Sequence, residues 1–376
     1  MSGAAGAGGV TPLARLLAAR IADEGPISVA AYMQACLHDP VHGYYRKQAA
    51  IGAGGDFVTA PEISQVFGEL IGLWCAVVWQ QMGEPGRVRI VELGPGRGTL
   101  MRDALRAARL VPAFHRAMSV DLVETNTTLV AAQRACLTDA AVPIRWSDDL
   151  QPSSAPSIVI ANEFLDTLPV AQWVFRGGRW LGRRVGLAGS GELAFVEDSS
   201  GDEPSSSPPP HIAATGDGDI FETRAPAFAK WAAKFAALRV STAALFIDYG
   251  HAEPGLGDTL QAVRGHRYDD PLRAPGESDL TAQVDFAAFA AEVSRHGFNC
   301  DGPLAQGEFL GRLGIVERAS RLMEANPGKA LEIESGALRL MSPGGMGSRF
   351  YALGVRSKGL ATLPGFDRVD SGAAAP

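Results

Sequence analysis

Short apolar runs alternate with amphipathic segments through the central part of the chain. The runs cover residues 88–93, 119–124, 144–146, 157–161 and 243–248, and segments with helical spacing, such as 99–109 and 127–135, separate them. Strands this short and this apolar are typical of a parallel sheet that helices cover on both faces. The pattern therefore predicts an α/β fold with a doubly wound, mostly parallel sheet.

The segments before and after this alternating region predict further structural elements that are added to the sheet. Residues 11–81 have mainly helical spacing, with one helix expected to begin near Pro61. Residues 173–196 alternate in the manner of β-hairpins, and residues 198–210 are too polar to form a core. We expect a helical N-terminal cap (1–84), a cofactor-binding core (85–172), a β-hairpin insertion with a mobile loop (173–222), the remainder of the catalytic domain (223–357) and a flexible tail (358–376).

Charge and composition exclude several classes of binding partner, among them nucleic acids, membranes and metal ions. The chain has 34 Lys and Arg against 41 Asp and Glu, a formal net charge of −7, so no basic field attracts a nucleic acid. The most apolar stretch, 70–79, is too short to span a bilayer, and the N-terminus does not resemble a secretory signal. Cysteines stand singly and histidines form no ligand pattern, so no metal site is expected. These features predict a soluble protein without membrane insertion.

A glycine-rich turn follows the first apolar run. Glu92 stands two residues before a Gly-Pro-Gly-Arg-Gly segment, whose side-chain-poor positions let the backbone approach a ligand closely. A Walker A loop requires Gly-Lys-Ser/Thr, and a dinucleotide turn requires glycine or alanine where Thr99 stands. An acid before a GxGxG turn suits S-adenosylmethionine (SAM), whose ammonium and sulfonium groups are positive. We predict a Rossmann-like SAM-binding domain whose turn contributes Glu92, Gly94, Pro95, Gly96 and Gly98.

Acidic side chains mark the ends of the next two apolar runs. Glu124 ends the second run, where a carboxylate can accept hydrogen bonds from both ribose hydroxyls, as it also does in NAD enzymes. Asp148, Asp149 and Leu150 follow the third run, where an acid can bind the adenine amine. For either aspartate, a solvated turn position is an almost equally good interpretation. The predicted cofactor site thus extends over three neighbouring strand ends.

The fourth apolar run leads into Asn162-Glu163-Phe164-Leu165-Asp166, at the sheet edge where α/β enzymes bind ligands. One interpretation is a helix start capped by Asn162, and the other is a reaction centre in the crevice of the glycine turn. We favour the second, with Asn162 as a candidate both for the reaction centre, where its amide can face the activated methyl group, and for cofactor binding. Glu163 is then the candidate partner of a cationic acceptor such as guanidinium, with Asp166 and Glu62 as further candidate acids.

A set of sequence blocks together resembles the MidA family of methyltransferases. The blocks are 43–45, 55–64, 92–98, 161–169, 248–250, 275–276 and 279–281, and the resemblance extends from about residue 25 to 356. This family includes a mitochondrial factor for respiratory complex I assembly that methylates a protein arginine. The resemblance implies a class I methyltransferase fold in which Gly94, Gly96, Gly98 and Glu124 hold SAM and residues 162–164 line the reaction centre. Gln283 stands where many relatives carry histidine, so we expect no catalytic histidine there.

These observations predict a SAM-dependent methyltransferase that acts on an arginine of an acceptor protein. The resemblance implies a respiratory complex I subunit as the candidate partner, with a cytoplasmic location in a bacterium or the mitochondrial matrix in a eukaryote. Two alternatives stay open: a SAM-binding assembly or scaffold protein without turnover, and an NAD-dependent oxidoreductase. The sequence does not predict an oligomeric state.

Overall fold

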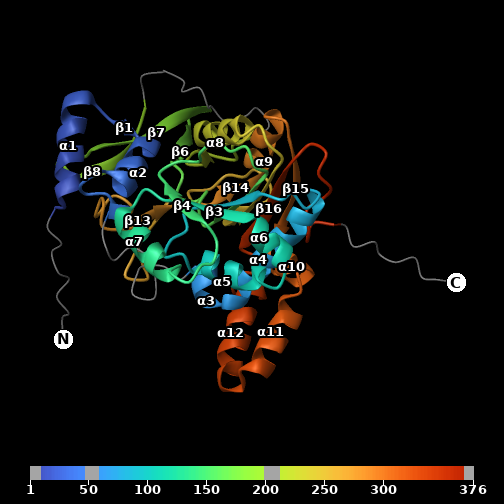
Figure 1. The fold of residues 1–376 in the computed structure, drawn as a ribbon. Coiled ribbons are helices and arrows are strands. Elements are labelled where there is room, and N and C mark those ends of the chain that lie inside the picture. Colours follow the sequence, from blue (N-terminus) through green and yellow to red (C-terminus); the bar gives the residue numbers. More distant parts are fainter. Residues whose placement is uncertain (1–9, 47–58, 199–211, 368–376) are drawn as a thin grey trace.

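The computed structural model describes residues 10–46, 59–198 and 212–367, which are built around an eight-stranded central sheet (Figure 1). Its main path, in spatial order, is β15 (Phe298–Ala305), β16 (Phe350–Ser357), β10 (Thr242–His251), β5 (Ser157–Asn162), β2 (Val88–Leu93), β3 (Met118–Val123) and β4 (Ile144–Ser147). The short β14 (Val284–Asp285) pairs with the end of β10. Strands β4 to β10 are parallel, whereas β16 runs antiparallel between β10 and β15. Winding reverses between β2 and β5, which makes their carboxyl ends the switch point where ligands bind.

Alternate residues of the central strands enter two apolar cores on opposite faces of the sheet. Ile90 and Ile158 belong to one core, and Val91 and Val159 belong to the other. The first core receives α4 (Gln65–Gln81), α5 (Thr99–Ala108) and α6 (Pro112–Ala117), and the second receives α8 (Ala225–Ala237) and α9 (Phe286–Arg295) (Figure 1). The connection from β3 to β4 is α7 (Thr127–Cys136). The predicted doubly wound α/β fold is confirmed.

A second, antiparallel sheet packs with the first helices of the chain. It contains β1 (Ile27–Ser28), β6 (Ala171–Arg176), β7 (Arg179–Leu187), β8 (Leu193–Glu197) and β9 (Ile220–Thr223). Its partner helices are α1 (Pro12–Glu24) and α2 (Val29–His38), which share an apolar core with it (Figure 1). The N-terminal region is therefore divided, because α1 and α2 join the hairpin sheet while α4 packs on the central sheet.

Two additions to the fold were not predicted. A three-stranded sheet is formed by β11 (Gln261–Arg264), β12 (Arg267–Asp269) and β13 (Asp279–Thr281). A helical insertion between β15 and β16 consists of α10 (Gln306–Arg312), α11 (Ile315–Ala325) and α12 (Ala330–Met341), and α11 and α12 project away from the sheet (Figure 1). Single turns of 3-10 helix occur at η1 (Tyr44–Arg46) and η2 (Pro327–Lys329).

The helix expected to begin near Pro61 is two helices. The first, α3 (Ala60–Ile63), ends at Ser64, whose extended backbone (φ −153°, ψ 127°) breaks the helix and whose hydroxyl oxygen accepts a hydrogen bond from Val66 N at 3.3 Å. The second, α4, lies close against α5 because Gly72 has no side chain. A β-carbon there would stand 2.4 Å from Ala104 O.

The C-terminal segment 358–367 packs against the domain. Leu363 is fully buried, its N–H donates to Asp301 Oδ2 at 3.0 Å, and Trp74 Nε1 donates to Pro364 O at 3.1 Å. The packed chain thus continues to residue 367, beyond the predicted tail boundary at 357.

Residues 199–211, which include most of the predicted mobile loop, lie outside the described residues. None of the helices in the described ranges is long and apolar enough to cross a membrane.

Candidate active site

The glycine turn joins β2 to α5 at the carboxyl edge of the sheet. Gly94, Gly96 and Gly98 have φ values of 64°, 53° and 84°, a region that L-residues with a β-carbon avoid. The turn is closed by a hydrogen bond from Gly98 N to Pro95 O at 2.8 Å. A β-carbon on Gly94 would lie 3.2 Å from Phe164 Cδ2, so this glycine is also required by a close approach.

A cavity of about 780 Å³, here named the edge cavity, opens beside this turn. It brings together six of the residues singled out from the sequence: Gly94, Gly96, Glu124, Asp148, Asp149 and Glu163. Its other walls come from α2, which contributes His38, and from α8, which contributes Trp231. The strand ends that carry the predicted residues therefore meet at one hollow.

Glu124 is held in place within the edge cavity. Its Oε1 accepts a hydrogen bond from Asn126 N at 2.8 Å, and its Oε2 accepts one from Gln133 Nε2 at 3.3 Å. Burial raises the pKa of Glu124, while these hydrogen bonds and the nearby Arg46 oppose the rise. The carboxylate is thus oriented before any ligand arrives.

The two aspartates after β4 differ in their contacts. Asp149 Oδ1 accepts a hydrogen bond from Leu150 N at 2.7 Å and forms an ion pair with Lys234 of α8. Asp148 is exposed and lines the edge cavity, whereas Leu150 is buried in the core between the sheet and α8. Asp149 therefore ties this strand end to α8, whereas Asp148 presents an exposed side chain to the edge cavity.

The loop after β5 presents Glu163 to the edge cavity with an unusual backbone. Glu163 has φ 49°, which is rare for a residue with a side chain. Its Oε1 accepts hydrogen bonds from Ala60 N at 3.2 Å and from Asn162 Nδ2 at 3.1 Å. Burial, and secondarily the charge of Asp166, raise the pKa of Glu163 to about 7.

A buried carboxylate holds the start of this loop. Asp248 Oδ2 accepts hydrogen bonds from three consecutive backbone N–H groups, those of Phe164 at 3.0 Å, Leu165 at 2.9 Å and Asp166 at 3.1 Å. Asp248 Oδ1 accepts a fourth from Tyr249 N at 2.9 Å. These bonds fix the chain direction immediately after Glu163, so Asp248 stabilises the strained conformation.

A buried guanidinium holds the end of the same loop. Arg224, only 4% exposed, donates to Leu168 O at 3.0 Å and to Asp166 O at 3.1 Å. Its other donors reach Ala282 O at 2.6 Å and Gln283 O. Sequence reasoning missed both Asp248 and Arg224 as loop supports, because their partners are backbone atoms far away along the chain.

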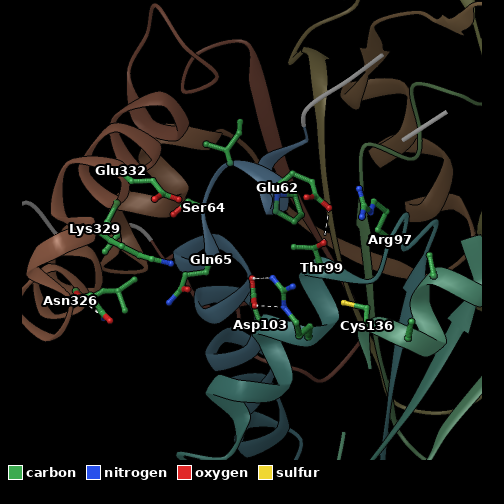
Figure 2. A pocket seen from close by; sticks show the side chains of 17 residues that line it. Glu62, Ser64, Gln65, Arg97, Thr99, Asp103, Cys136, Asn326, Lys329 and Glu332 are labelled. Atoms are coloured by element: carbon green, nitrogen blue, oxygen red, sulfur yellow. Dashed lines mark hydrogen bonds and ion pairs between the residues drawn. The ribbon is translucent and has the colours of Figure 1, made fainter. Parts of the chain in front are cut away.

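Two candidate acids do not enter the edge cavity. Asp166 is buried, and its Oδ2 accepts a hydrogen bond from the hydroxyl group of Tyr249 at 2.6 Å. Glu62 faces a separate cleft of about 770 Å³ between α3, α5, α7 and α11–α12, where its Oε1 accepts a hydrogen bond from Thr99 Oγ1 at 2.6 Å (Figure 2). The structure therefore leaves Glu163 as the acid of this group that lines the edge cavity.

Two buried polar atoms near the glycine turn have no hydrogen-bond partner among the described residues: Glu92 Oε2 and Asn162 Oδ1. The alternation of β2 and β5 places both side chains on the sheet face of Ile90 and Ile160, and the strands are direct neighbours. Burial raises the pKa of Glu92 to about 8. Unpaired buried acceptors cost free energy, so these two atoms fit a ligand that donates hydrogen bonds.

A model of the S-adenosyl-L-methionine-dependent methyltransferase family matches residues 70–304, more than half of the chain. The chain belongs to this family. It is a SAM-dependent methyltransferase with SAM as its cofactor, and the resemblance to the MidA family is confirmed. The oxidoreductase and non-catalytic scaffold alternatives are thereby set aside.

Relatives of this methyltransferase match almost its whole length. The mitochondrial protein arginine methyltransferase NDUFAF7 homolog of Drosophila melanogaster is 36% identical over 94% of this chain and 85% of its own length. The Danio rerio protein arginine methyltransferase NDUFAF7 is 34% identical over 90% of this chain and 85% of its own length. A COG1565 superfamily structure from Burkholderia thailandensis, bound to S-adenosyl-homocysteine, has a TM-score of 0.82 at 27% identity and covers 95% of this chain and 94% of that one.

Proposed function

We propose that this methyltransferase transfers the methyl group of SAM to an arginine side chain of an acceptor protein. The observation that carries the proposal is the Glu163 carboxylate, which lines the edge cavity at the sheet's switch point and is fixed there by Ala60 and Asn162. A carboxylate is a suitable partner for a planar guanidinium, which it can bind through two hydrogen bonds. The names of the fly and fish relatives as protein arginine methyltransferases support the same acceptor.

The proposed binding site of the cofactor follows from the hydrogen-bond donors and acceptors around the glycine turn. Glu124, already oriented by Asn126 and Gln133, suits the ribose hydroxyls, and Asp148 suits the adenine amine. The ammonium group of SAM offers three donors, which matches the unpartnered Glu92 Oε2 and Asn162 Oδ1. Gly94, Pro95, Gly96 and Gly98 form the turn along which the cofactor lies.

SAM supplies a methyl group on a positively charged sulfur atom. The protein's contribution is orientation: the hydrogen bonds that the described residues donate to Glu163 end on Oε1, and we expect Oε2 to align a guanidinium nitrogen. Phe164 and Trp231 pack edge to face, with ring centroids 5.0 Å apart, and line the same cavity. These two rings exclude water from the neighbourhood of the Glu163 carboxylate.

We further propose that the acceptor is a subunit of respiratory complex I, and that the enzyme works in the cytoplasm of a bacterium or in the mitochondrial matrix of a eukaryote. The support is the family to which the chain belongs and the mitochondrial names of its relatives.

The acceptor is tested with methyl-labelled SAM and a lysate of the source cells lacking this protein. Mass spectrometry of labelled proteins should place the methyl group on arginine, and a complex I subunit should be among the labelled proteins. Label on lysine, histidine or a carboxylate would contradict the arginine proposal. Arginine label confined to other proteins would contradict the partner while leaving the chemistry intact.

The role of Glu163 is tested by Glu163→Gln, with the half-exposed Glu197→Gln as its control. Loss of the carboxylate should reduce transfer about 100-fold, because the guanidinium is no longer aligned, while binding of S-adenosylhomocysteine is retained. Since the pKa of Glu163 is raised to about 7, wild-type kcat/KM for the acceptor should fall as pH drops through a value at or somewhat below 7, because the cofactor's positive charge lowers that pKa. Unchanged transfer in Glu163→Gln would remove this residue from the mechanism.

A further inference from the structure

A buried glutamine connects three parts of the cofactor site. Gln133 lies inside α7 and is completely buried. Its Nε2 donates to Gly96 O at 2.8 Å and to Glu124 Oε2 at 3.3 Å, and its Oε1 accepts from Trp146 Nε1 at 3.0 Å. One side chain therefore contacts the glycine turn, the ribose-side carboxylate and strand β4.

The orientation of this amide is determined by its neighbours. The indole N–H of Trp146 is only a donor, so it must face Oε1, and Nε2 must face the two acceptors Gly96 O and Glu124 Oε2. Arg134 stacks over the Trp146 ring, with its guanidinium carbon 4.1 Å from the ring centroid. This contact fixes the position of Trp146, which in turn fixes Gln133. The backbone also fits closely, since a β-carbon on Gly98 would lie 3.5 Å from Gln133 Cα.

We propose that Gln133 is a positioning residue for the cofactor, which orients Glu124 toward the ribose and fixes the glycine turn at Gly96. This inference rests on the ribose role proposed above for Glu124. Gln133 does not line the edge cavity and acts through the two groups that do.

Other charges around Glu124 must be considered in a pH experiment. Arg46 of η1 lies near the carboxylate and donates to Thr125 O at 3.0 Å, while Asp148 beyond β4 and His38 of α2 line the same cavity. Burial lowers the pKa of His38, and Arg46 adds to that effect. All of these groups are present in wild type and in the Gln133 variants, so a difference in pH dependence between the two reports on position 133.

The sharpest test is Gln133→Glu, which preserves shape and the acceptor for Trp146 but replaces the amide donor by a carboxylate facing Glu124. Two adjacent carboxylates share one proton and cannot both ionise without repulsion. S-adenosylhomocysteine, titrated calorimetrically, should bind about 10- to 100-fold more weakly than to wild type near pH 8. Near pH 5.5 a shared proton restores the hydrogen bond between positions 133 and 124 but not the bond to Gly96 O. The ratio of the variant's dissociation constant to the wild-type value should therefore be smaller near pH 5.5 than near pH 8.

A merely structural role would give a ratio that does not change with pH, and this result would overturn the proposal, as would unchanged affinity near pH 8. The matched control is Gln172→Glu, because Gln172 of the second sheet is also buried and donates to two carboxylates, those of Glu222 and Asp258. It should leave the pH dependence of binding unaltered.

Two further variants keep the outcomes distinguishable. If Gln133→Glu does not fold, Gln133→Met retains the length of the side chain without any donor, and its weaker binding should persist at both pH values. Wild-type affinity in Gln133→Met would refute the proposal. Glu124→Gln tests the underlying cofactor-binding site: unchanged binding there would refute the ribose role of Glu124, whereas weak binding there with normal binding in Gln133→Glu would refute only the role of Gln133.

Discussion

At the residue scale, burial governs the carboxyl groups near the glycine turn. The pKa is raised to about 8 for Glu92 and to about 7 for Glu163, from an ordinary value of 4.5. A raised carboxyl pKa stabilises the fold below about pH 4.5, and this contribution is lost as pH rises through the folded value. Near neutral pH these groups are therefore destabilising in the free protein, and a bound cation can offset that cost.

Binding of SAM should release protons near pH 6.5. Glu92 is then mostly protonated in the free protein, and it must ionise to bind the ammonium group. Calorimetry in two buffers of different ionisation enthalpy measures the number of protons released. We expect up to about one proton from Glu92, and Glu92→Gln should remove that share while Glu163→Gln leaves it. Equal proton release in wild type and Glu92→Gln would contradict the assignment.

At the element scale, the loop after β5 depends on charged groups from neighbouring elements. Burial raises the pKa of Asp248, with Asp166 and Glu163 adding to the rise, and the N–H donors oppose it. The N–H groups of Phe164, Leu165, Asp166 and Tyr249 all donate to this one carboxylate. The backbone conformation of Glu163 and the hydrogen bonds of Asp248 consequently depend on each other.

Replacement of Asp248 by Asn should loosen this loop. An amide has one acceptor oxygen for four donors, so we expect a loss of about 2–3 kcal/mol in the free energy of unfolding, measured by urea denaturation. Methyl transfer should fall more than affinity for S-adenosylhomocysteine, because Glu163 loses its position. The control is Asp217→Asn, in which the carboxylate caps an exposed turn at Gly177 N. Normal stability and transfer in Asp248→Asn would show that the loop holds its shape without the carboxylate.

The turn between β2 and α5 should be intolerant of a single methyl group. Gly94→Ala introduces a β-carbon at φ 64° and 3.2 Å from Phe164, which should cost about 1–2 kcal/mol in stability and displace the backbone from the cofactor. Affinity for S-adenosylhomocysteine should fall at least about tenfold. Gly255→Ala, whose added carbon meets no atom within 4 Å, should bind normally. Equal binding by the two variants would argue against a close approach at Gly94.

At the scale of the whole molecule, segments remote in sequence complete the domain. Strand β16 enters the sheet between β10 and β15, and the segment after it covers the core that contains Trp74 and Phe309. Leu363 belongs to this core and is fully buried. The C-terminal segment therefore contributes to global stability although it follows the last strand.

Truncation of this side chain tests that contribution. Leu363→Ala should lower the free energy of unfolding by about 2–4 kcal/mol through lost burial and a residual cavity, as measured by chemical denaturation. Leu331→Ala on α12, where the side chain is 82% exposed, should change stability by less than about 0.5 kcal/mol. A loss in Leu363→Ala as small as in the control would mean that the segment is not part of the cooperative core.

The sequence by itself determined the strands, the glycine turn and the acids that end the strands, because these features depend on local spacing. The predicted run 88–93 coincides with β2, and Glu124 and Glu163 line one cavity because parallel strands bring their carboxyl ends to one edge. Only the tertiary structure decided what supports them. Gln133, Asp248 and Arg224 act on atoms contributed by other elements, and buried hydrogen bonds of this kind leave no periodic pattern in the chain. The tertiary structure also decided which acids reach the cavity, since Asp166 is buried against Tyr249 and Glu62 faces a separate cleft, where it is hydrogen-bonded to Thr99.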